Sequence, residues 1–335
     1  MKLFLALITV FIICFTTYSQ PTAIKNLVLE GGGIRGIAYV GAIDELQKNH
    51  TLDSIKNIAG TSAGSIIAAM LSVGYTSNEL ITILSSIKFQ KFNDNEFGFI
   101  SGSKRMLDKY GWYKGNKFEN FIEKLMAEKT DINAITLKQL HELHVKNPNQ
   151  FKELYVTATD ILTQTAVVIS YQNYPEMTVS KAVRCSMSIP FYFKPVPWNF
   201  VDKDFSEIHY PQLLVDGGVL LNYPIFIFDN QFQKNQTIGL RLDDSIESYN
   251  FTKQVNQNSN LNSSLKIKNL KDFTMDFYYL IMTAINDKNL TALDKERTIQ
   301  ISPGNIGQKI KRLKKSEVEL LVENGRKAVL LYLQK

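Results

Sequence analysis

The N-terminal third of the chain alternates short apolar runs with segments of helical character. An apolar run over 24–30 precedes a helical pattern over 37–48, and a run over 55–59 precedes an entirely apolar segment over 65–73. Short buried strands that alternate with helices are typical of a parallel sheet. A helix that is apolar on every side is expected to lie in the interior. The pattern therefore predicts an α/β fold with a mostly parallel central sheet.

The same patterns continue downstream without an internal repeat or a clear domain boundary. Ser316 and Glu319 form a capping box before a last helix with apolar residues at helical spacing. One domain from about residue 20 to the end of the chain is the simplest interpretation. Further helices are expected over 77–88, 118–128, 179–187 and 273–286, and further strands over 154–159, 166–170, 213–215 and 237–242.

The first twenty residues have the order of a secretory signal peptide. Met1 and Lys2 give a positive start, an apolar run covers 3–14, and the small residue Ser19 stands where cleavage is expected. The run is too short to span a bilayer comfortably. We predict a signal peptide over 1–19, a mature domain over 20–335, and a secreted, periplasmic or envelope location. An uncleaved N-terminal anchor is the alternative.

Composition narrows the classes of protein that fit. Hydrophobic residues make up 44% of the chain and charged residues 21%, which is typical of a globular protein. The net charge of +6 permits attraction to anionic lipid surfaces but does not indicate nucleic-acid binding. Without the signal peptide, Cys185 is the only cysteine, so no intrachain disulfide is expected. The sequence contains no metal-binding motif, and we expect neither a metal nor another cofactor.

Ser62 lies in a glycine-flanked turn between the second strand and the apolar helix. Gly60 and Gly64 stand two residues away on either side, in the pattern G-x-S-x-G. A sharp strand-to-helix turn strains its central residue, and glycines remove side chains that would collide there. The hydroxyl is then exposed at the positive end of the helix dipole. The pattern alone is weak, but its position predicts the nucleophile of a serine hydrolase.

A second glycine-rich turn, residues 31–36, follows the first strand. Gly31, Gly33 and Gly36 also match the dinucleotide fingerprint G-x-G-x-x-G. That fingerprint requires an acidic residue at the end of the next strand, where this chain has the serine turn instead. We therefore expect the glycine turn to approach an ester oxygen closely and to donate N–H groups to it.

A serine hydroxyl needs a base, and Asp216 is the better placed candidate. It follows the apolar residues 213–215 and precedes Gly217 and Gly218. A strand end opposite the serine turn would bring its carboxylate to Ser62. A simple Asp-Gly turn is an equally good interpretation of the spacing.

A histidine base is the second possibility. His209 lies in a polar loop before Asp216, and with Asp160 it would complete a histidine-dependent α/β-hydrolase. His50 is expected at the end of the first helix, and His141 and His144 on a solvated helix surface.

The three blocks, in this order, resemble the patatin-like phospholipases over roughly residues 24–224. The G-G-G-x-R-G block of that family stands at 31–36, its G-T-S-A-G turn at 60–64 and its D-G-G block at 216–218. Residues 184–195 and 222–224 also match, with Cys185 where a small alanine is more usual. The resemblance implies a three-layer α/β/α sandwich with a mostly parallel central sheet.

The resemblance also implies the roles of single residues. Ser62 would be the nucleophile and Asp216 its base, in a dyad that contains no histidine. The oxyanion hole would be built from Gly31, Gly32 and Gly33, with the second and third donating their N–H groups and the first shaping the turn. Arg35 would brace this loop or meet an anionic group. The expected supporting residues are Arg35, Gly60, Gly64, Gly217 and Gly218.

The activity implied is that of a lipid acyl hydrolase of the phospholipase A or lysophospholipase type, acting through an acyl-enzyme. A phospholipid or other acyl-ester lipid would be the substrate, with peripheral contact to a membrane surface and no nucleic-acid partner. A histidine-dependent esterase and a non-catalytic lipid-binding module are the alternatives.

Three segments have two interpretations each. The Asn- and Ser-rich segment 243–271 predicts a surface loop or insertion, with a lid as the alternative. The basic run 309–315 predicts a solvated approach to the last helix, or else a membrane contact. The aromatic and proline-rich stretch 189–198 predicts an edge segment packed on the core, or else the lining of an acyl groove.

Overall fold

The computed structural model describes most of the chain, and no helix in the described ranges is both long and apolar enough to cross a bilayer. The expected signal peptide over 1–19 lies outside the described residues, as does almost all of the polar segment 243–271. The described residues are 23–94, 105–201, 209–243, 267, 270–286, 290–307 and 312–334.

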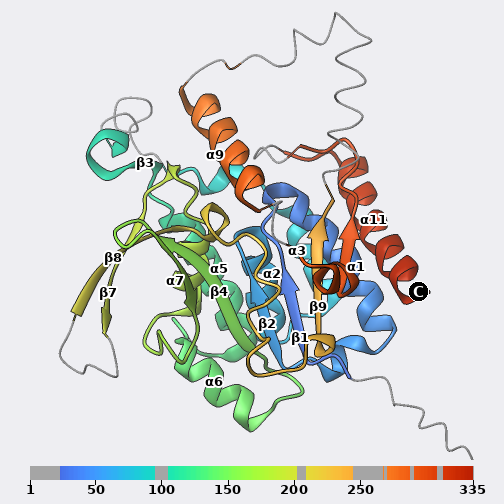
Figure 1. Cartoon of the computed structure of the whole chain (residues 1–335). Helices are drawn as coiled ribbons and strands as arrows, with labels where there is room; N and C mark the ends of the chain where they lie inside the picture. Colours follow the sequence, from blue (N-terminus) through green and yellow to red (C-terminus); the bar gives the residue numbers. More distant parts are fainter. Residues whose placement is uncertain are drawn as a thin grey trace, which may run out of the picture.

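An eight-stranded, mostly parallel sheet forms the centre of the molecule (Figure 1). Its strands are β1 (Asn26–Leu29), β2 (Asn57–Gly60), β4 (Glu153–Asp160), β5 (Thr165–Ile169), β7 (Val196–Val201), β8 (His209–Asp216), β9 (Thr237–Leu242) and β10 (Thr298–Ile301). They lie in the order β10-β9-β1-β2-β4-β8-β7, and β5 pairs with β4 outside this order. Pairing is parallel from β10 to β4, whereas β8, β7 and β5 are antiparallel to their neighbours.

The helices pack mainly against one face of this sheet. They are α1 (Ile37–Lys48), α2 (Ala63–Ser72), α3 (Ser77–Ser86), α5 (Asn116–Thr130), α6 (Leu137–Lys146), α7 (Val179–Ser186), α9 (Leu270–Asn286), α10 (Ala292–Glu296) and α11 (Lys315–Leu333). A separate two-stranded parallel sheet joins β3 (Gly111–Tyr113) to β6 (Phe191–Phe193).

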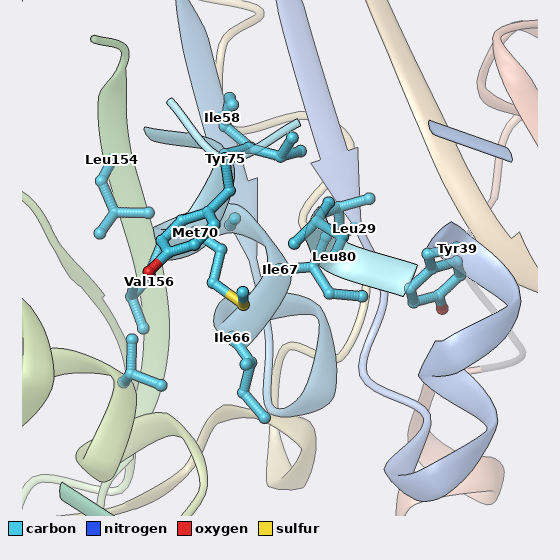
Figure 2. Packing of buried hydrophobic residues seen from close by; sticks show 14 of the residues in the cluster. Leu29, Tyr39, Ile58, Ile66, Ile67, Met70, Tyr75, Leu80, Leu154 and Val156 are labelled. Atoms are coloured by element: carbon cyan, nitrogen blue, oxygen red, sulfur yellow. The ribbon is translucent and has the colours of Figure 1, made fainter. Parts of the chain in front are cut away.

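Alternate side chains of the strands enter two different cores, because successive residues of a strand face opposite sides. Leu29 and Ile58 point towards Ile67 and Met70 of α2 in the main core (Figure 2). Val28 lies on the other face, in a smaller cluster covered by the irregular segment 223–232. The expected α/β fold with a mostly parallel central sheet is thus confirmed.

The aromatic stretch 189–198 contributes two strands that the sequence patterns did not predict. Its first part forms β6, and its second part begins β7, which lies at the edge of the large sheet. The edge interpretation is therefore confirmed for β7, where Pro197 is tolerated because an edge strand has one unpaired side. Strand β8 is longer than expected, since pairing with β7 extends it back to His209.

Helices α1 and α11 cross with their backbones in direct contact. A Cβ atom added to Gly325 of α11 would overlap the carbonyl of Ala38, and one added to Gly41 of α1 would overlap the carbonyl of Val322. Glycine is thus required on both sides of this crossing because no side chain fits between the helices.

We predict that Gly325→Ala lowers the free energy of unfolding by about 1–3 kcal/mol, because the added methyl group forces the two helices apart. Gly307→Ala is the matched control, since a Cβ there meets no atom within 4 Å. It should change stability by less than about 0.5 kcal/mol. Urea denaturation followed by circular dichroism measures both, and equal midpoints would contradict the close crossing.

Candidate active site

The register of the sheet brings three distant turns together. Leu29 at the end of β1 pairs with Gly60 at the end of β2, so the glycine turn and the serine turn leave the sheet side by side. Gly60 also pairs with Val156 of β4, and Ala158, two residues further along β4, pairs with Asp216. Ala158 is two residues beyond Val156, just as Ser62 is two residues beyond Gly60. Asp216 and Ser62 therefore lie at about the same height along the sheet.

Ser62 adopts a backbone conformation that L-residues rarely occupy. Its φ is 49° and its ψ is −120°, between the end of β2 and the start of α2. A Cβ on Gly60 would lie 2.5 Å from the Gly64 carbonyl oxygen, and a Cβ on Gly64 would lie 2.5 Å from that of Leu29. The two flanking glycines thus permit a turn too tight for side chains, and the turn projects the Ser62 hydroxyl away from the helix.

The Ser62 hydroxyl donates a hydrogen bond of 2.8 Å to Oδ2 of Asp216. Oδ1 of the same carboxylate accepts the N–H of Gly218, also at 2.8 Å. Asp216 is fully buried and Ser62 is 6% exposed. Burial raises the pKa of Asp216 to about 7, against the opposing effect of the hydrogen bonds that it accepts. The result is a carboxylate that takes up a proton near neutral pH, in contact with a serine hydroxyl.

Tyr278 of α9 is a third partner of this carboxylate that the sequence did not reveal. Its hydroxyl hydrogen-bonds to Asp216, and its ring is buried with Tyr192 and Phe193. A Cβ on Gly218 would lie 2.7 Å from the same hydroxyl. Helix α9 therefore covers the Ser62–Asp216 pair and contributes a donor that stabilises the charged form of the carboxylate.

The glycine turn lies directly against Ser62. A Cβ on Gly31 would lie 3.2 Å from the Cβ of Ser62. The Gly31 N–H donates to the Asn222 carbonyl at 3.1 Å, and the Asn222 side chain donates to the Gly31 carbonyl at 3.0 Å. Gly31 therefore anchors the turn, and its N–H is engaged elsewhere. Gly33, at φ 57°, begins the 3-10 helix η1 (Gly33–Gly36), and Gly32 is its N-cap.

The end of α7 holds both members of the pair in place. The Ser62 N–H donates to Oγ of Ser186 at 2.8 Å, and the Asp216 N–H donates to the Ser188 carbonyl at 3.0 Å. The sulfur of Met187 lies 3.5 Å from the Ser62 hydroxyl oxygen. The end of α7 and the two residues that follow it therefore fix the backbones of Ser62 and Asp216.

The remaining expected site residues surround this pair. Arg35 lies on η1 and is 2% exposed. Its charge affects Tyr279 of α9: burial raises the pKa of Tyr279, and the positive charge of Arg35 opposes that rise. A Cβ on Gly217 would overlap the side chain of Thr157. The hydroxyl of Thr157 is 2.6 Å from that of Thr61, next to the nucleophile.

The four histidines are not brought to Ser62. His209 begins β8, and Asp216 ends it, about 23 Å away at 3.3 Å per residue. Asp160 uses its oxygens to accept the N–H groups of Leu162 and Leu213 and the hydroxyl of Thr163. The remaining three have other partners: His50 contacts Asp53, and His141 and His144, half-buried on α6 rather than solvated, contact Glu153 and the Phe151 carbonyl.

Within the described residues, no group of three or more His, Cys, Asp or Glu side chains is arranged to hold a metal ion. The arrangement around Ser62 instead combines a serine hydroxyl, a buried carboxylate with a raised pKa, and a glycine-rich turn. Those are the components of an acyl-transfer site.

Comparison with known proteins identifies a family and several relatives of this chain. The model of the family described as "Patatin-like phospholipase" matches residues 27–229. The chain is 32% identical over 314 residues to protein R571 of Acanthamoeba polyphaga mimivirus, which covers 92% of this chain and 94% of that protein. It is 28% identical over 273 residues to the probable lipid hydrolase 463L of Invertebrate iridescent virus 6, covering 76% and 86% of the two chains.

Solved structures with the same fold include two bacterial proteins. VipD from Legionella pneumophila superimposes with a TM-score of 0.59 at 18% identity, over 93% of this chain and 67% of VipD. The type III effector ExoU gives a TM-score of 0.53 at 15% identity, over 94% of this chain and 53% of ExoU. At these identities the likeness concerns the fold alone. The family model, however, matches more than half of the sequence, and the chain therefore belongs to the patatin-like phospholipase family.

Proposed function

We propose that this protein is a serine lipid acyl hydrolase of the phospholipase A or lysophospholipase type, with Ser62 as nucleophile and Asp216 as its base. The observation that carries the proposal is the 2.8 Å hydrogen bond between the Ser62 hydroxyl and the buried Asp216 carboxylate. Membership of the patatin-like phospholipase family supports an acyl-ester lipid as substrate. The likeness to a probable lipid hydrolase supports it as well.

The chemistry follows from these contacts. Asp216 accepts the hydroxyl proton while Oγ of Ser62 attacks the ester carbonyl carbon, and the negative charge moves to the carbonyl oxygen. The N–H groups of Gly32 and Gly33 stabilise that oxyanion. The ester bond then breaks, and the proton passes from Asp216 to the departing alcohol. In the second half, Asp216 takes a proton from water, the hydroxide attacks the acyl-enzyme, and Ser62 recovers its proton as the fatty acid leaves.

The burial of Asp216 suits it to this role. A solvated aspartate has a pKa near 3.8 and is a weak proton acceptor, whereas burial raises the pKa of Asp216 to about 7. A general base is most effective when its pKa lies near the operating pH. The burial of Asp216 therefore supports a carboxylate as the general base, a role for which many hydrolases use histidine.

The outer face of α9 supports contact with a lipid surface. Leu270, Phe273, Phe277 and Leu280 recur at helical spacing, and each is between 48% and 65% exposed. The opposite face of the same helix buries Tyr278 over the active site. In Figure 1, α9 stands at the margin of the molecule, above the sheet. An apolar stripe on the helix that covers the nucleophile would bring the site to the lipid.

Export is a further part of the proposal. The order of charged, apolar and small residues over 1–19 supports a signal peptide and hence a secreted, periplasmic or envelope location. N-terminal sequencing of the protein recovered outside the cytoplasm should begin at Gln20. Recovery of the whole chain with Met1 intact would contradict cleavage.

We predict that Ser62→Ala and Asp216→Asn each lower fatty-acid release from a phospholipid or short-chain ester by at least about 10³-fold, because each removes one half of the proton-transfer pair. His209→Ala should retain normal turnover. Loss of activity in the His209 variant, with its fold intact, would favour a histidine-dependent esterase. Normal activity in the Ser62 variant would show that Ser62 is not the nucleophile and would contradict the proposed mechanism.

The pH dependence follows from the need for a charged Asp216. We predict that kcat/KM rises with pH to a plateau, with a midpoint near 7, because only the carboxylate accepts the serine proton. Tyr278→Phe removes a donor that favours the carboxylate, so its midpoint should move to higher pH. Tyr192→Phe removes a hydroxyl bonded to Asn93 in the same aromatic cluster and should leave the midpoint unchanged. Identical profiles for all three proteins would contradict the contact between Tyr278 and Asp216.

We predict that Phe273→Ser combined with Phe277→Ser reduces sedimentation with phospholipid vesicles by about tenfold, because two large apolar side chains leave the stripe. Hydrolysis of a soluble short-chain ester should be unaffected. Leu331→Ser, at an exposed leucine of α11, is the matched control and should bind vesicles normally. Equal vesicle binding by both variants would place the lipid contact elsewhere.

A further inference from the structure

A cavity of about 810 Å³ lies between α1, α3 and α11, and neither Ser62 nor Asp216 is among its lining residues. It is bounded by the first turn of α1, the last turn of α3 and the first turns of α11. Helices α1 and α11 both begin beyond strands that end at the carboxyl edge of the parallel sheet, β1 and β10 respectively. The cavity therefore lies near the same edge of the sheet as Ser62, which is where open α/β sheets bind their ligands.

Part of the cavity wall is apolar, and the rest consists of serine and charged side chains. Ile81 and Leu84 come from α3, and Val318 and Val322 come from α11. These side chains belong to the main core or pack against it. Ile34 completes the wall on the α1 side and belongs to η1, the same short helix that Gly33 begins. A long hydrocarbon group is the kind of ligand that such a wall accommodates.

The lining also includes exposed cations. Lys88 follows α3 and Arg312 precedes α11, and in the described part of the chain neither of them pairs with a carboxylate. By contrast, Lys315 lies 3.8 Å from Glu319, and Arg326 is bound to Asp44 at 2.8 Å. Two positive charges thus remain available beside an apolar cavity. Arg312 belongs to the basic run 309–315, of which 309–311 lie outside the described residues.

We propose that this cavity binds an amphiphile with one hydrocarbon chain and an anionic head group. The chain would lie against Ile81, Leu84 and Val318, and the head group would meet Lys88 and Arg312. Its volume is within the range of about 300–1,000 Å³ that is usual for small-molecule sites. A fatty-acid anion and a lysophospholipid with a phosphate head group share this chemistry. The site is separate from the Ser62–Asp216 pair, so the proposal does not depend on hydrolysis.

Binding is best measured with the full chain carrying Ser62→Ala, so that turnover is absent. The probe is cis-parinarate, a fluorescent fatty-acid anion, which is displaced in turn by palmitate, 1-palmitoyl lysophosphatidate and hexadecanol. We expect saturable binding of one probe molecule per chain. Displacement by palmitate identifies a carboxylate head group as accepted, and displacement by lysophosphatidate identifies a phosphate; failure of both anions would overturn the proposal.

Two variants test the wall and the charges separately. Adding Ile81→Trp, which fills the cavity at a half-buried position, should weaken probe binding at least about tenfold. Adding Lys88→Glu with Arg312→Glu should weaken the binding of both anions at least about tenfold and leave the binding of hexadecanol unchanged. Lys138→Glu, on the exposed surface of α6, is the matched charge control. Circular dichroism verifies folding, and unaltered affinity in a folded Ile81 or charge-reversed variant would assign the probe to another place and refute the site.

Discussion

The hydrogen bond between Ser62 and Asp216 involves a carboxylate that has been taken entirely out of water. It joins residues 154 positions apart, and its acceptor is fully buried. Burial raises the pKa of Asp216 from 3.8 to about 7, so between these values the folded chain keeps a proton that the unfolded chain releases. Stability therefore falls as the pH rises through this window. The donors Gly218, Ser62 and Tyr278 offset part of the cost of burying this carboxylate, and its pKa lies near neutral pH.

The strained backbone of Ser62 needs similar support from its surroundings. A non-glycine residue with φ near 49° costs of order 1–3 kcal/mol, and it persists only where neighbouring contacts determine the conformation. Ser186 accepts the Ser62 N–H, while Thr61 contacts Thr157 on the adjacent strand. The N–H of Ser62 and the side chain of the preceding residue are thus each held by a buried hydroxyl. This leaves the Ser62 side chain facing Asp216.

The sequence allowed the turns of the site to be predicted, but not their supports. Glycines at 31, 60 and 64 indicate tight turns because no other residue type fits at these positions. This requirement is local and can therefore be recognised from the sequence. Tyr278 and Ser186 gave no such signal, since an ordinary tyrosine in an amphipathic helix looks the same whether or not it faces a carboxylate. Strand β8 was placed too short because its first half, with Pro211 and Gln212, lacks the apolar run that a buried strand shows and is held by pairing with β7.

The elements that form the candidate site and the elements that cover it come from different parts of the chain. The residues that would react, Ser62 and Asp216, lie within the segment 27–229 that matches the family model. Two later helices lie beyond it: α9 covers the carboxylate through Tyr278, and α11 supplies one wall of the separate cavity. The turns that place Ser62 and Asp216 contain no residue of the later segment. In the proposed function, the bond-breaking step therefore depends on residues that precede β9, whereas the helix that covers them follows β9.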